Sequence, residues 1–116
     1  MKTEVILRGS LARRSRLASA CEARIQQTLQ RHGERIAHVE LRIESTNAHD
    51  LCYHATLIVQ PVRGHALLMS AIADQPWKAC AQASQNARKQ LEAARKRNRA
   101  RTRRAQRVWS EQRWAA

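Results

Sequence analysis

The chain has 116 residues, enough for one domain that buries its own core without disulfides or metal. With 22 Lys and Arg against 9 Asp and Glu, its formal net charge is +13 and its pI is near 11.5, which favours nucleic acid or an anionic surface as partner. No apolar run approaches the roughly 20 residues that cross a bilayer, the first residues lack a signal-peptide pattern, and three widely spaced cysteines predict free thiols in a reducing cytoplasm.

A strand and an amphipathic helix are predicted first. Residues 3–8 form a β-prone run that ends at a Gly9-Ser10 turn. The helix is indicated by apolar residues that recur every four positions: Leu17, Cys21, Ile25 and Leu29. We expect Ser10 or Ser15 to cap this helix and Gly33 to end it.

Three consecutive strands follow. Residues 38–44 alternate between apolar and polar side chains, residues 51–60 repeat the alternation, and residues 65–73 form a third run after Pro61 and Gly64. The short connections favour an antiparallel meander.

The second helix should begin at Pro76, after a cap at Asp74 or Gln75. Its apolar stripe is narrow and rich in small residues: Trp77, Cys80, Ser84, Ala87, Leu91 and Ala94. We expect Trp77 to be buried in this stripe rather than to stack on bases. The order β-α-β-β-β-α predicts an α+β fold in which a four-stranded sheet carries two helices on one face.

Basic residues are concentrated at the C-terminal end. Residues 1–74 contain ten basic and seven acidic residues, whereas residues 75–116 contain twelve and two. Phosphates of RNA neutralise such a run with release of counterions, and arginine adds bidentate contacts, so we prefer RNA binding to a merely solubilising tail. Trp109 and Trp114 could either stack on bases or pack locally. The run from residue 95 to residue 107 holds eight cations: Arg95, Lys96, Arg97, Arg99, Arg101, Arg103, Arg104 and Arg107.

Catalytic and metal-binding patterns are weak. Cys52 and His54 project from one strand face, but no second ligand pair stands at zinc spacing, so we expect no metal and no cofactor. The sequence contains no glycine-rich phosphate loop or nucleophile elbow, which favours a protein that is not an enzyme. The alternatives are a small basic ribonuclease of the ribosome-dependent mRNA-cleaving type, with Tyr53 and His54 in its site, and a non-specific DNA-binding protein.

Taken together, three features resemble the bacterial ribosome hibernation-promoting factor family. They are the "LRGS" turn after the first strand, the Asp74-Gln75-Pro76-Trp77 helix start, and the "RKQLEAARKR" segment. The resemblance covers residues 2–97, so we divide the chain into a hibernation factor-like domain, 1–97, and a basic C-terminal tail, 98–116. The tail is longer and richer in arginine than short members of the family need, and the chain has no room for the dimerisation domain of long members.

The resemblance implies a double-stranded-RNA-binding-like fold. It also implies a cytoplasmic factor, monomeric off the ribosome, that occupies the tRNA and mRNA channel of the small subunit and inhibits translation in stressed cells. Neither a membrane nor a small-molecule substrate is expected. The RNA-binding residues implied on the helices are Arg13, Arg14, Arg16, Arg24, Arg88, Lys89, Arg95, Lys96 and Arg97, and the basic tail adds Arg99, Arg101, Arg103 and Arg104.

Overall fold

A computed structural model describes the backbone of residues 1–46 and 52–114 and the side chains of residues 1–46 and 52–104. The predicted order of elements is confirmed. The chain forms β1 (Lys2–Leu7), α1 (Ser15–Leu29), β2 (Ile36–Ser45), β3 (Tyr53–Pro61), β4 (Leu67–Ala73) and α2 (Pro76–Trp114), with short 3-10 turns η1 (Gly9–Leu11) before α1 and η2 (Gln30–Arg35) after it.

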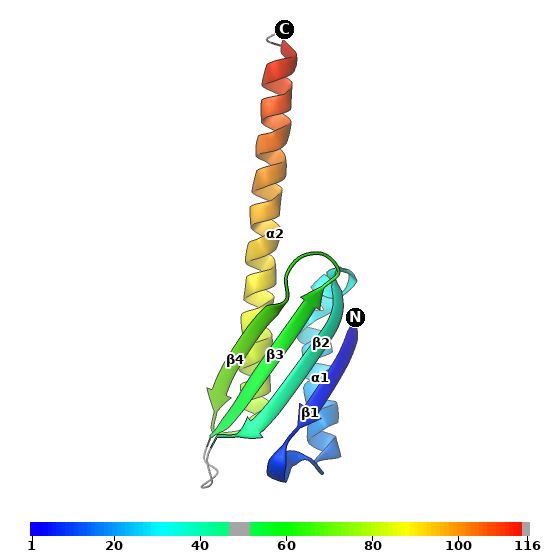
Figure 1. Ribbon diagram of the computed structural model, residues 1–116, viewed down its shortest axis with the longest axis vertical. Helices are drawn as coiled ribbons and strands as arrows, with labels where there is room; N and C mark the ends of the chain where they lie inside the picture. The colour runs from blue at the N-terminus through cyan, green and yellow to red at the C-terminus, as the bar shows by residue number, and fades with distance from the viewer. Residues whose placement is uncertain (47–51, 115–116) are drawn as a thin grey trace.

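The four strands form one sheet in the order β1-β2-β3-β4. Strand β1 is parallel to β2, and the other neighbours are antiparallel, as the short connections predicted. Both helices cover the same face of this sheet, which leaves the opposite face, here called the outer face, free of helices (Figure 1). The predicted arrangement of a sheet with two helices on one side is therefore confirmed.

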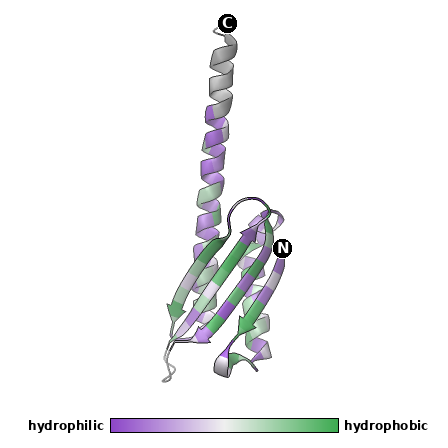
Figure 2. Ribbon diagram, viewed as in Figure 1, coloured by the Kyte–Doolittle hydropathy of each residue, from purple (hydrophilic) through white to green (hydrophobic). Residues whose placement is uncertain are grey.

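The core lies between the sheet and the helices. Every second residue of each strand points into it, and the predicted stripe of α1 meets them from the other side. Figure 2 shows the resulting bands of hydrophobic and hydrophilic residues along the strands. The fully buried side chains include Ile25 and Leu29 of α1, Val39, Leu41 and Ile43 of β2, and Leu57 and Val59 of β3.

Small residues let α2 lie close to the sheet. Ala79, Ala83 and Ala87 are completely buried, and the Ser84 hydroxyl donates a 2.8 Å hydrogen bond to the Cys80 carbonyl. The predicted burial of Trp77 is wrong, because its side chain is 56% exposed. Pro76 takes the inward position at the start of the helix instead. The buried stripe is shifted toward the alanines, so Trp77 stands at its edge.

The ends of α1 also differ from expectation. Arg14 occupies the N-cap position and makes no side-chain cap, so neither Ser10 nor Ser15 fulfils that role. The buried Leu11 anchors η1, and the chain reaches the helix only at Ser15. At the other end, α1 stops at Leu29, and Gly33 lies within η2.

Helix α2 extends far beyond the sheet. The molecule is about 70 Å long and only 23 Å and 18 Å across, because α2 continues without interruption through residue 97 (Figure 1). The described side chains from residue 96 to residue 104 are all exposed, and Figure 2 shows this part of the helix as hydrophilic. Trp109 and Trp114 have side chains outside the described residues. None of the described helices combines the length and the apolarity of a membrane-crossing segment.

Candidate nucleic-acid interface

The two helices lie side by side and run in the same direction. Near their beginnings the Cys80 thiol donates a 3.8 Å hydrogen bond to the Cys21 carbonyl. Further along, Arg24 and Arg88 line a common cavity, and the turn after α1 reaches the middle of α2. The groove between them therefore follows α2 from its first turn toward its exposed extension.

An arginine-rich cleft opens in the middle of this groove, and we name it the seam cleft. It has a volume of about 590 Å³ and carries three guanidinium groups, Arg24 from α1, Arg31 from η2 and Arg88 from α2. The Nε atom of Arg88 is buried without a hydrogen-bond partner among the described residues. Polar neutral side chains complete the lining: Gln27, Thr28, Gln30 and Gln85. Such a set of donors suits the oxygens of phosphate groups.

A second cleft lies where α2 leaves the sheet, and we name it the root cleft. Its volume is about 420 Å³, and Arg35 of η2 faces Arg95, Arg99 and Arg103 of α2 across it. Residues four apart on a helix lie about 6 Å apart along its axis, a distance comparable to that between successive phosphates on an RNA strand. The root cleft is therefore suited to a run of phosphates rather than to a single anion.

A third, smaller cavity joins the beginning of the groove. It has a volume of about 210 Å³ and contains Trp77 beside Arg24, Cys21 and Cys80. The hydrogen bond with Cys21 and burial raise the pKa of the Cys80 thiol, which therefore stays protonated. The Trp77 indole is exposed, as a residue that stacks on bases must be, with Arg24 in the same cavity and the Lys78 ammonium 5.7 Å from the centre of its ring. The exposure of Trp77 contradicts its predicted burial, and base stacking by this residue stays a prediction.

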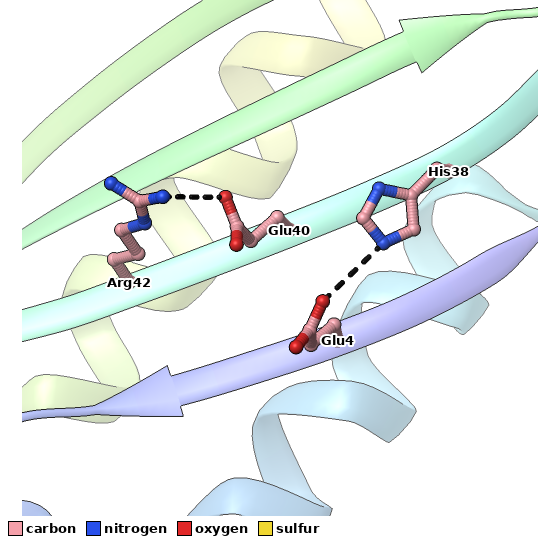
Figure 3. Close-up of polar contacts among 4 residues, drawn as sticks. All are labelled: Glu4, His38, Glu40 and Arg42. Carbon is pink, nitrogen blue, oxygen red and sulfur yellow. Dashed lines mark ion pairs between the residues drawn. The ribbon is translucent and has the colours of Figure 1, made fainter.

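The outer face of the sheet has a different electrostatic character. The carboxylate of Glu40 forms a 3.2 Å ion pair with the Arg42 guanidinium, and the carboxylate of Glu4 lies 3.6 Å from Nε2 of His38 (Figure 3). Within the part of the chain that the structure describes, no arginine of the seam or root cleft has a carboxylate partner of this kind. The unneutralised positive charge therefore gathers on the helix side.

The residues weighed for catalysis or metal binding are not near these clefts. His54 lies on the outer face, opposite Glu44 and Ile72 in the strand register, while Tyr53 packs against the core. Among residues 1–46 and 52–104, no three His, Cys, Asp or Glu side chains gather as a metal site requires. His54 and the arginines of the seam and root clefts are on opposite sides of the sheet.

The structure brings together only part of the predicted set. Arg24 and Arg88 meet in the seam cleft, and Arg95, Arg99 and Arg103 line the root cleft. Arg13 and Arg14 precede α1 instead of belonging to it, and with Arg16 they lie at the end of the molecule where α2 begins. The remaining predicted residues are exposed on α2 outside both clefts: Lys89, Lys96, Arg97, Arg101 and Arg104.

Two arginines that sequence reasoning missed complete the clefts. Arg31 and Arg35 belong to η2, which follows α1 as a tight turn. A cluster of basic residues just after the predicted helical stripe, at Arg31, His32 and Arg35, was the available signal. Their use depends on where η2 packs against α2, which is a tertiary property.

Comparisons with known proteins support the fold. No family model matches the chain. No curated protein matches it either. Among solved structures, the chain is similar to a ribosomal subunit interface protein from Coxiella burnetii, with a TM-score of 0.66 and 14% sequence identity over 82% of this chain and 98% of that chain. At this identity the likeness establishes a shared fold.

Proposed function

We propose that this protein binds the RNA of the small ribosomal subunit through its helix side and inhibits translation by occupying the tRNA and mRNA channel. The observation that carries the proposal is the groove between α1 and α2, where Arg24, Arg31 and Arg88 converge without carboxylate partners among residues 1–46 and 52–104. Two further arguments support it: the net charge of +13 and the fold shared with a protein described as a ribosomal subunit interface protein.

The mechanism follows from the two faces of the molecule. Phosphates of folded rRNA enter the seam and root clefts, each replacing condensed counterions with guanidinium contacts. The exposed Trp77 stacks on a base next to Arg24. The sheet supports both helices as a rigid layer, so the bound protein fills space that tRNA or mRNA would need. No chemical step is required, and inhibition is by occupancy.

Sedimentation with purified small subunits tests this proposal. The protein should co-sediment at low salt, lose affinity steeply as salt rises, and be displaced by tRNA bound in the channel. The double variant Lys2→Ala/Arg42→Ala is a matched control, since both residues belong to the outer face and the change in net charge equals that of Arg24→Ala/Arg88→Ala. Protein that stays in the supernatant at low salt, or binding that bound tRNA does not affect, contradicts the proposal.

A translation assay separates the alternatives. Added protein should lower the yield of a cell-free reaction while the mRNA stays intact. If the mRNA is cut and His54→Ala abolishes the cutting, the protein is a ribonuclease. If duplex DNA outcompetes rRNA for the protein, it is a DNA-binding protein instead.

A further inference from the structure

A hollow of different character adjoins the root cleft. It lies between η2, the turn between β3 and β4, and α2, and its volume is about 520 Å³, within the range of cavities that hold small organic ligands. We name it the hairpin basin. Its floor is apolar, formed by Val62, Leu67, Leu91 and Ala94.

The rim of the hairpin basin carries three guanidinium groups against one carboxylate, that of Glu34, and is therefore cationic on balance. Arg35 and Arg95 line both the basin and the root cleft, and Arg63 adds a third guanidinium from the β3–β4 turn. An apolar floor beside a row of guanidinium groups fits a ligand with a flat, weakly polar body and an attached anion. A nucleotide has this composition, because its base is planar and its phosphate is charged.

His32 supplies a polar group at the wall of the basin. Its side chain is only 3% exposed, and its Nε2 atom has no hydrogen-bond partner among the described residues. An unpaired buried nitrogen costs free energy, which a hydrogen bond to a ligand recovers. The edge of a nucleobase offers such donors and acceptors.

We infer that the hairpin basin takes one unstacked nucleotide of the bound RNA, with its base on the apolar floor and its flanking phosphates in the root cleft. The inference rests on the proposed RNA binding and adds to it a preference for RNA with an unpaired residue. Arginine planes and the His32 ring line the base, as in other sites that hold single-stranded bases.

The test compares two short RNA hairpins that differ by one bulged nucleotide, using the full-length protein. We expect the bulged hairpin to bind about tenfold more tightly. Val62→Asp places a carboxylate at the basin and should abolish this difference. Ile72→Asp is the matched control, because Ile72 is 61% exposed on the outer face and Val62 is 60% exposed, and both variants change the charge equally.

A second measurement follows His32 directly. Long-range ¹H–¹⁵N spectra of the imidazole should show its ring nitrogens shifting when the bulged hairpin is added to the wild type. The same spectra of Val62→Asp should show no shift.

Each outcome separates this inference from the proposed function. Equal affinity for the two hairpins, with co-sedimentation intact, overturns the nucleotide site and leaves the ribosome proposal standing. If neither hairpin nor small subunit binds, both fail. Saturation by a free mononucleotide or an acidic peptide without any preference for the bulge overturns the inference in favour of that ligand.

Discussion

The number of phosphates held in the seam cleft can be measured from the salt dependence of binding. Arg24 and Arg88 come from different helices and line the cleft together. Replacing both with alanine removes two guanidinium contacts, and each lost phosphate contact lowers the slope of log affinity against log salt by about 0.9. The double variant should therefore have a slope about 1.8 smaller than the wild type.

This change in slope sets the loss of affinity. If the two proteins bind equally at about 1 M salt, where screening is nearly complete, a slope difference of about 1.8 becomes a loss of about 60-fold at 0.1 M. Stability should change little, because Arg24 is exposed, the buried Nε of Arg88 has no hydrogen-bond partner among the described residues, and alanine is the better helix former.

The assay is equilibrium binding of labelled small subunits at several salt concentrations, with thermal melts of each variant. The control Lys2→Ala/Arg42→Ala should keep the wild-type slope, since its two cations lie on the outer face. An equal fall in slope for both double variants would refute the reasoning, because binding would then follow net charge alone. An unchanged slope for Arg24→Ala/Arg88→Ala would refute it as well.

Three further predictions concern stability. Trp77→Ala should cost less than about 1 kcal/mol in denaturant unfolding, whereas Ile25→Ala, which empties a fully buried position, should cost about 2–5 kcal/mol; a similar loss for both would mean that Trp77 is not exposed in solution. Gly64→Ala should lose about 1–2 kcal/mol because φ is 102° there, while Gly33→Ala, without such a φ, should not; equal melting temperatures would contradict this turn geometry. Burial lowers the pKa of His32 below its usual 6.5, so the unfolded chain takes up the proton at a higher pH than the folded protein does. The stability of the fold should therefore fall as the pH drops through 6.5. Melting curves of His32→Gln should lose part of this pH dependence, and an unchanged dependence would contradict the buried state of the ring.

The fold was readable from the sequence because its signals are periodic. Alternation in β2 and β3 gave both the strands and their buried faces, and the spacing of Leu17 to Leu29 gave the inner face of α1. Short connections then left few ways to arrange the strands. These signals depend on local geometry, which a sequence carries directly.

The errors arose where local patterns compete. Trp77 fits the spacing of Cys80 and Ser84, and both of those residues are buried. Ala79 and Ala83 are buried beside them, so the centre of the buried face lies away from Trp77 and the indole stays exposed. Likewise, η1 ends at the buried Leu11, which separates the candidate cap Ser10 from the start of α1.

The candidate site was only partly predictable, because a cleft is made by side chains that are distant in sequence. The excess of arginine identified the chemistry, yet it could not tell Arg95 and Arg99, which line the root cleft, from Arg97 and Arg101, which do not. That distinction depends on which side of α2 faces η2. Arg31 and Arg35 gain their importance from the same packing.

The most direct test of the account is a density map of the protein bound to the small ribosomal subunit. The account predicts that the protein lies in the tRNA and mRNA channel with α1 and α2 against rRNA, phosphates beside Arg24, Arg31 and Arg88, and the outer face of the sheet turned away. A map in which the outer face contacts the rRNA, or in which the channel is empty at saturating protein, would contradict it.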